Sequence, residues 1–189
     1  DKEVNPENPP SLPENQGLFS IDFASNFYFG SFAISAQDKR YYAKPQRLLS
    51  VDGMFIEEEI RPNYVQVSDR RPSNTRGGWE LSVSQNEQFY SAETGSELTG
   101  ASFILQNQQL VSVQDGIEPG LQQTTPITLI PGGAKRTVLK AQGAEGTGTW
   151  IYRFGDFESA GRSVILEVPK GANPDAASYK TTLTWELSS

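Results

Sequence analysis

Glu57, Glu58 and Glu59 form the densest group of catalytic-type side chains in the sequence. A glycoside hydrolase uses two carboxyl groups about 5–9 Å apart across a cleft. Alternate residues of an extended segment face the same way, so Glu57 and Glu59 could form such a pair. Nothing else in the sequence predicts a cleft around them, and an exposed acidic loop is the preferred interpretation. Hydrolysis of a glycan is therefore the weakest functional hypothesis.

The sequence contains no cysteine and no histidine. Thiol nucleophiles, Ser-His-Asp triads, structural zinc sites and histidine-ligated metals are therefore excluded. The pair Asp115-Gly116 is typical of a turn and not of a calcium loop, and no phosphate-binding glycine motif is present. We therefore expect a protein that is not an enzyme and that needs no cofactor or metal.

Three arginines, Arg70, Arg71 and Arg76, surround the turn-forming segment 72–74. In an acidic protein such a loop could bind the carboxylates of a ligand or of an acidic partner. Loop arginines more often stay solvated or pair with a nearby carboxylate such as Asp69. Further candidates for an exposed binding surface are four aromatic residues in the N-terminal quarter and one arginine of a later strand: Phe27, Tyr28, Tyr41, Tyr42 and Arg153.

The composition limits the class of ligand. The 189 residues carry a formal net charge of −7, and the isoelectric point is about 4.7. This charge argues against an electrostatic interaction with nucleic acid or with an anionic membrane. No apolar stretch approaches the roughly 20 residues of a membrane-spanning helix, so we expect no membrane insertion.

The chain divides into a short tail and one domain. Residues 1–17 contain four prolines, several Asn and Glu, and only Val4 and Leu12 as large apolar residues. This composition predicts a flexible, Pro/Asn-rich linker with little to bury. Residues 18–189 are expected to form a single domain, since a chain of this length can bury a sizeable core without disulfides or metals.

Short runs of alternating apolar and polar residues, bounded by Gly, Pro, Asn and Asp, dominate residues 18–189. This pattern predicts an all-β protein, an antiparallel sandwich or barrel-like fold of about ten short strands with little helix. The nearest approach to a helical pattern is residues 41–59, which could hold one short turn of helix. The expected strands are 18–23, 31–35, 64–68, 79–84, 101–105, 110–113, 127–130, 136–141, 149–154, 163–168 and 179–187.

The tetrapeptide Trp-Glu-Leu-Ser occurs twice, at 79–82 and at 185–188. In a strand, Trp79 and Leu81 point to one face, as do Trp185 and Leu187. The rings could stack on sugars, but each tryptophan shares its face with other apolar residues. We therefore interpret these four residues as core positions. The third tryptophan, at position 150, also lies in an expected strand and follows a glycine-rich turn.

Residues 179–187 read Tyr-Lys-Thr-Thr-Leu-Thr-Trp-Glu-Leu, which resembles the distal motif of the WxL domain family of cell-surface proteins from low-GC Gram-positive bacteria. The segment 54–60, with its acidic triplet, departs from that family by extending a connection. Four further segments match in the family's order: Ile-Asp-Phe at 21–23 leading to Phe-Gly at 29–30, Val-Ser-Asp-Arg-Arg at 67–71 before Gly-Trp-Glu-Leu-Ser-Val at 78–83, Gly-Thr-Gly-Thr-Trp at 146–150, and Ser-Val-Ile-Leu-Glu-Val-Pro at 163–169.

The resemblance implies an extracellular module, held on the cell wall without covalent attachment and binding peptidoglycan. It also implies a second surface protein, the WxL-interacting protein, as a partner. The alternative is a protein-interaction module that binds this partner or a host extracellular matrix protein through an exposed strand edge or apolar patch.

Overall fold

The computed structural model describes residues 4–6, 17–50, 52, 54 and 60–189, and they are almost entirely β-structure. The all-β prediction is confirmed, and the arrangement is a sandwich and not a closed barrel. In chain order the elements are β1 (Val4–Pro6), β2 (Phe19–Ala24), β3 (Lys39–Tyr42), β4 (Leu48–Ser50), β5 (Tyr64–Asp69), β6 (Gly78–Gln85), β7 (Ser102–Leu105), β8 (Gln108–Ser112), β9 (Gly120–Leu121), β10 (Ile127–Leu129), β11 (Arg136–Gln142), β12 (Gly148–Phe154), the 3₁₀-helix η1 (Ala160–Arg162), β13 (Val164–Val168) and β14 (Leu183–Ser188).

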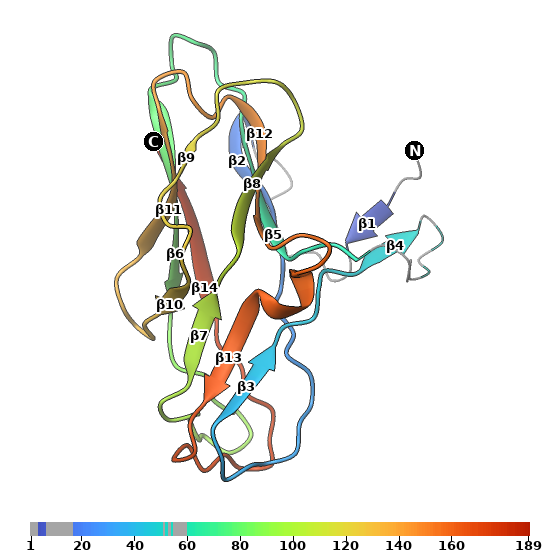
Figure 1. The fold of residues 1–189 in the computed structure, drawn as a ribbon. Coiled ribbons are helices and arrows are strands. Elements are labelled where there is room, and N and C mark those ends of the chain that lie inside the picture. Colours follow the sequence, from blue (N-terminus) through green and yellow to red (C-terminus); the bar gives the residue numbers. More distant parts are fainter. Residues whose placement is uncertain (1–3, 7–16, 51, 53, 55–59) are drawn as a thin grey trace.

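Three antiparallel four-stranded sheets make up the body of the molecule (Figure 1). Two of them, ordered β2-β5-β12-β8 and β14-β6-β11-β9, run along the upper part of Figure 1. The third, ordered β10-β7-β13-β3, forms the lower part. A separate two-stranded pair, β1 with β4, projects from the side. Among the described residues, no helix is long and apolar enough to cross a membrane.

The core lies between the inner faces of the sheets. On β6 the alternation places Trp79, Leu81 and Val83 inward, with exposed fractions of 3%, 0% and 0%. On β12 it does the same for Trp150 and its neighbours at 152 and 154. The two Trp-Glu-Leu-Ser segments lie on adjacent strands, because β14 pairs with β6 and Leu187 stands opposite Leu81. Trp79 and Trp150 are therefore core residues, whereas Trp185 packs against the same core and is partly exposed.

Two of the predicted strands are not formed, or are formed only in part, in the structure. Residues 31–35 run without a strand partner, and of 179–187 only the part from Leu183 onward belongs to β14. Residues 179–182 nevertheless lie beside residues 86–90, through the isolated antiparallel bridge of Lys180 with Tyr90 and the hydrogen bond from Asn86 to Thr182. The predicted turn of helix within residues 41–59 is wrong where the structure describes it, since Lys39–Tyr42 and Leu48–Ser50 are strands.

Two other predictions lie wholly or largely outside the described residues. The acidic triplet Glu57–Glu59 is not described. Of the expected linker 1–17, only residues 4–6, which form β1 against β4, and residue 17 are described.

Candidate functional site

A long groove lies beside the third sheet, between two chain segments that approach it from opposite ends of the sequence. One wall is the segment 24–41, which leads from β2 into β3. The other wall is the segment 174–185, which leads into β14. The groove has a volume of about 980 Å³, large enough for an extended ligand. Its floor is apolar and consists of Phe89, Leu98, Phe103, Leu166 and Val168.

The first wall begins where β2 ends, at Ser25, whose hydroxyl accepts a hydrogen bond from the amide of Tyr64 at 3.0 Å. Phe27 and Phe29 then turn toward the core and pack edge-on against Phe103, with ring centroids 5.6 and 5.7 Å away. Gly30 follows with φ of +93°, a conformation that side-chain-bearing residues rarely adopt. This turn frees the chain from the core, so the residues after it face the groove and solvent.

Exposed aromatic rings line this wall. Tyr28 is 59% exposed and Phe32 is 54% exposed. The Phe32 ring stacks on Tyr41 of β3, with centroids 4.1 Å apart and planes inclined by 25°. The ammonium group of Lys44 lies 5.4 Å from the centroid of the Tyr28 ring. Large exposed rings held in place by such contacts are suited to stacking against the apolar faces of a ligand.

The opposite wall is more polar. The hydroxyl of Tyr179 accepts a hydrogen bond from the amide of Asp175 at 2.8 Å. The carboxylate of Asp175 in turn accepts one from the hydroxyl of Ser96 at 2.5 Å. Lys180 is anchored by two backbone hydrogen bonds with Tyr90, each 2.9 Å long. Among the described residues, the charged side chains that line the groove are Lys39, Asp175 and Lys180, so a ligand there meets a largely uncharged surface with polar groups at its rim.

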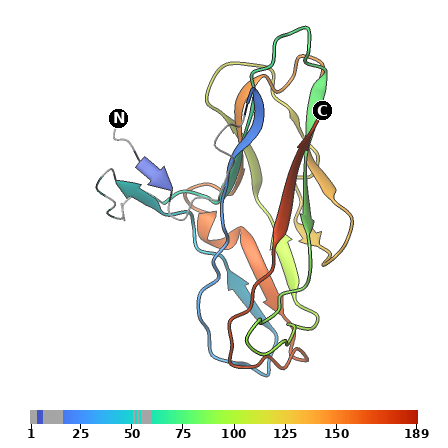
Figure 2. The same ribbon diagram turned by 180° about the vertical axis from the view of Figure 1, so that it is seen from behind.

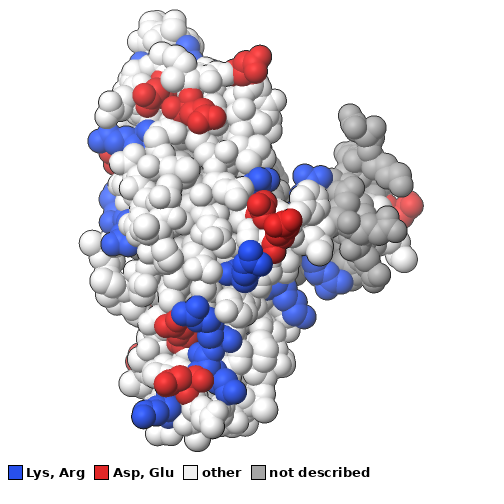
Figure 3. Space-filling model, viewed as in Figure 1, with Lys and Arg blue, Asp and Glu red and all other residues white. Residues whose placement is uncertain are grey.

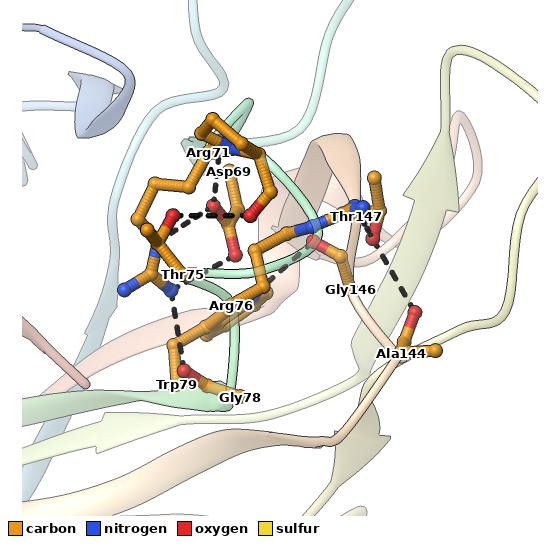
Figure 4. Close-up of polar contacts among 10 residues, drawn as sticks. Asp69, Arg71, Thr75, Arg76, Gly78, Trp79, Ala144, Gly146 and Thr147 are labelled. Atoms are coloured by element: carbon orange, nitrogen blue, oxygen red, sulfur yellow. Dashed lines mark hydrogen bonds and ion pairs between the residues drawn. The ribbon is translucent and has the colours of Figure 1, made fainter.

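The arginine loop lies away from the groove and is occupied by internal contacts (Figure 4). The guanidinium of Arg71 forms a bidentate pair with Asp69, at 2.8 and 2.9 Å, and also donates to the carbonyl of Gly78 at 3.2 Å. It stacks on the Phe19 ring at 3.9 Å. Arg76 donates to the hydroxyl of Thr147. These contacts make the loop a brace between β5, β6 and the turn before β12.

Asp69 is the buried half of that brace, with only 2% of its side chain exposed. Burial by itself raises the pKa of Asp69. The hydrogen bonds from the side chain and backbone of Arg71, together with its charge, outweigh burial and hold the pKa of Asp69 below its ordinary value. The same pairing raises the pKa of Arg71. Both groups are therefore charged at neutral pH.

The structure brings some of the predicted surface residues together and separates the others. Phe27, Tyr28 and Tyr41 all line the groove. Tyr42, 40% exposed, is not among the lining residues, because neighbouring strand residues face opposite ways. The remaining four candidates have other surroundings: Arg70 donates to Thr149 at 3.3 Å, Arg71 is paired with Asp69, Arg76 donates to Thr147, and Arg153 donates to Gln109 at 2.8 and 3.1 Å.

Sequence reasoning missed Phe32, Ile34, Tyr179 and Asp175 as groove residues. The alternation of residues 31–35 predicts a strand, and a strand residue is expected to be covered on at least one face. Phe32 and Ile34 are instead 54% and 58% exposed. The prediction of a paired strand therefore gave no reason to expect exposed side chains at these positions. No sequence pattern near residues 31–35 indicates that they lie close to residues 174–182.

The two tryptophan motifs differ in their burial. Trp79 is buried and its indole N–H donates to the carbonyl of Gly146 at 3.1 Å. Trp185 and Leu187 are half-buried. The centroid of the Trp185 ring lies 6.3 Å from that of Tyr152, and Trp185 also lines the groove. The first motif is thus a core element, whereas the second lies at the boundary between core and groove.

Charge and metal chemistry give no further site in the described part of the chain. Acidic and basic side chains are interspersed on the face shown in Figure 3 and do not form a single basic patch. Arg40 pairs with Glu167. Among the residues the structure describes, no three His, Cys, Asp or Glu side chains are grouped so that they could hold a metal ion.

The sequence from residue 2 to residue 189 matches the family model described as "WxL domain surface cell wall-binding". The chain therefore belongs to the WxL domain family, and its class is that of a β-rich, surface cell-wall-binding domain. No curated protein and no solved structure matches the chain. The family resemblance drawn from residues 21–187 is confirmed.

Proposed function

We propose that this chain is a non-catalytic, extracellular module that attaches the protein of which it is part to the cell wall by binding peptidoglycan without a covalent bond. The single observation that carries the proposal is the groove: exposed aromatic rings on one wall, hydrogen-bonding groups on the other and an apolar floor between them. Membership of a cell-wall-binding family supplies the context.

Peptidoglycan combines the two kinds of group that the groove offers to a ligand. Its sugar rings have apolar faces that can stack on Phe32 and Tyr28. Its peptide stems carry carboxylates, which Lys39 and Lys180 at the rim can attract. The volume of about 980 Å³ lies at the upper end of the range for ligand pockets, roughly 300–1,000 Å³, so more than one sugar or peptide unit can lie along it.

The proposal is tested by sedimentation with purified, protein-stripped peptidoglycan. We expect the chain to sediment with the polymer and the Phe32→Ala and Tyr28→Ala variants to bind roughly tenfold more weakly, since each change removes an exposed stacking surface. Phe157→Ala is the matched control, because Phe157 is 72% exposed but does not line the groove. Equal loss of binding in all three variants, or no binding by the unchanged chain, contradicts the proposal.

The non-catalytic part of the proposal has its own measurement. Incubation with peptidoglycan should release no soluble sugar fragments. If fragments do appear, the change Glu59→Gln tests the acidic triplet, and loss of release in that variant replaces the proposal with a glycan hydrolase.

A second candidate function is docking of a surface protein, either a WxL-interacting protein or a host extracellular matrix protein. The observation that favours it is the backbone of residues 29–34. In the described part of the chain, the amides and carbonyls of these residues make no hydrogen bond to protein. An extended partner segment could supply those bonds. If the chain alone stays in the supernatant and sediments only when such a partner is added, the partner carries wall attachment.

A further inference from the structure

The outer edge of β14 has no strand beside it among the described residues, because β14 pairs with β6 alone. The amide of Asn86 donates to the carbonyl of Thr182 at 2.9 Å, which fixes the alternation of the antiparallel ladder. Hydrogen-bonded and non-hydrogen-bonded pairs alternate in such a ladder. The amides and carbonyls of Leu183, Trp185 and Leu187 therefore point away from β6, toward the free edge.

The core is incompletely covered along this edge. The side chains of Leu183, Trp185 and Leu187 are only half-buried, whereas Leu81 and Val83 on the neighbouring strand β6 are fully buried. β2, the edge strand of the facing sheet, lies on the same side of the molecule as β14 (Figure 2). Its inward residues 19 and 21 are half-buried as well. The apolar side chains of both edge strands are thus left partly exposed to solvent.

β14 also lacks the features that protect natural edge strands from pairing. The range Leu183–Ser188 contains no proline, and its register with β6 runs without a bulge. Its one charged residue is Glu186, which is bound by Lys135 at 2.8 Å. An unprotected edge of this kind is a template for another strand.

We propose that a second copy of this chain pairs with β14 edge to edge, in antiparallel orientation, about a two-fold axis at Trp185. In this register Trp185 stands opposite Trp185 of the second copy, and Leu183 stands opposite Leu187. All of these residues have outward-pointing backbone groups in both copies. Each opposed pair can therefore exchange two hydrogen bonds, and the two sheets become continuous.

The charges of the strand are compatible with a second copy in this register and disfavour one of the two neighbouring registers. Centring on Trp185 places the exposed Thr184 of each copy opposite Glu186 of the other, so no like charges face one another. Sliding the strands by two residues in one direction instead places Glu186 opposite Glu186 of the second copy. Such a dimer carries two grooves on one body, so that a repeating wall polymer can be held at two points.

The test measures the oligomeric state of the chain by analytical ultracentrifugation over a range of protein concentrations. We expect a concentration-dependent dimer. Thr184→Glu places a carboxylate opposite Glu186 at two symmetric positions and should raise the dimer dissociation constant by about tenfold. Thr184→Lys makes the same two contacts attractive and should lower it. Thr184 is exposed, and its hydroxyl donates only to Asn86, at 2.9 Å, so both variants should fold.

Hydrogen exchange of the backbone amides supplies an independent measurement. In dilute protein the amides of Leu183, Trp185 and Leu187 should exchange quickly, and at high concentration they should become protected. A chain that stays monomeric at all concentrations overturns the proposal. A dimer that responds equally to Thr184→Glu and Thr184→Lys also overturns it, because the contact then lies elsewhere. Neither result affects peptidoglycan sedimentation, so failure here is distinct from failure of the proposed function.

Discussion

Replacing Arg71 by methionine tests whether the arginine loop is a structural brace or a ligand-binding surface. Methionine keeps an unbranched apolar side chain beside the Phe19 ring but removes the bidentate partner of Asp69 and the hydrogen bond to the carbonyl of Gly78. The Asp69 carboxylate, 2% exposed, is then left without its compensating charge.

Removing one member of a buried ion pair typically costs 3–5 kcal/mol, and because Arg71 is 16% exposed we take the lower end, about 3 kcal/mol at pH 7. Urea unfolding followed by tryptophan fluorescence measures this loss in the free energy of unfolding. Arg153→Met is the matched control. Arg153 donates only to the neutral side chain of Gln109, so its removal should change the free energy of unfolding by no more than about 0.5 kcal/mol.

The loss should depend on pH in a defined direction. In the unchanged chain the pKa of Asp69 lies below its ordinary value of 3.8, so the pair stabilises the fold above that pH and its contribution disappears as the pH falls further. In Arg71→Met burial, which raises the pKa of Asp69, outweighs the weaker opposing effect of the Arg76 charge. The variant is therefore destabilised above pH 3.8, and this destabilisation disappears once Asp69 is protonated. The difference between the two proteins should shrink to under about 1 kcal/mol near pH 3.

Two results would refute this reasoning: a loss at pH 7 no larger than that of Arg153→Met, or a loss that is the same at pH 3 and pH 7. Sedimentation with peptidoglycan adds a functional readout. Since the Arg71 guanidinium is occupied within the protein, folded Arg71→Met should bind the polymer as the unchanged chain does.

Three further substitutions test the tryptophan strands. Trp79→Phe loses the indole hydrogen bond to Gly146 and leaves a cavity, and urea unfolding should show a loss of about 2–3 kcal/mol. In Gly146→Ala the new residue must adopt φ of +71°, and its Cβ lies only 2.6 Å from the indole nitrogen of Trp79. The melting temperature of this variant should be well below that of the control Gly161→Ala, where nothing lies within 4 Å of the added carbon. Trp185→Phe should lower the free energy of unfolding by only about 1–2 kcal/mol, because the ring is half-buried. Phenylalanine keeps an aromatic ring at the groove, so the folded variant should still sediment with peptidoglycan.

Strand positions and their inward faces could be predicted wherever the alternation of apolar residues was long and undisturbed. β6 and β12 are such cases: Trp79 and Leu81, and likewise Trp150 and Tyr152, are buried as the period of two requires. β3 was not predicted, because Lys39 and Arg40 begin it and its burial comes only from packing beside β13. Alternation reports that a chain is extended, but it does not report whether a neighbour lies beside it.

The residues that line the groove could likewise be predicted only in part from the sequence. Aromatic residues close together in the sequence, such as Tyr28 and Tyr41, could be proposed as a surface from composition alone. Tyr179 could not be assigned to that surface, because only the fold brings residues 174–185 across from residues 24–41. In the arginine loop, the pairing with Asp69 that the sequence offered is present, because the two residues are close together in the chain. The sequence did not show that β5 and the sheets would bury the Asp69 carboxylate.

The two copies of Trp-Glu-Leu-Ser show how position in a sheet decides what one motif does. On β6, with strands on both sides, every backbone group of the motif has a ladder partner available, and Trp79 uses its indole N–H to hold the turn at Gly146. On β14, with a strand on one side, the same side chains cover the core only in part, and the backbone of Trp185 and Leu187 faces outward. The chemistry of the tetrapeptide is identical in both places. The first copy of the tetrapeptide lies in a central strand and fills the core. The second lies in an edge strand, beside which another strand can be added.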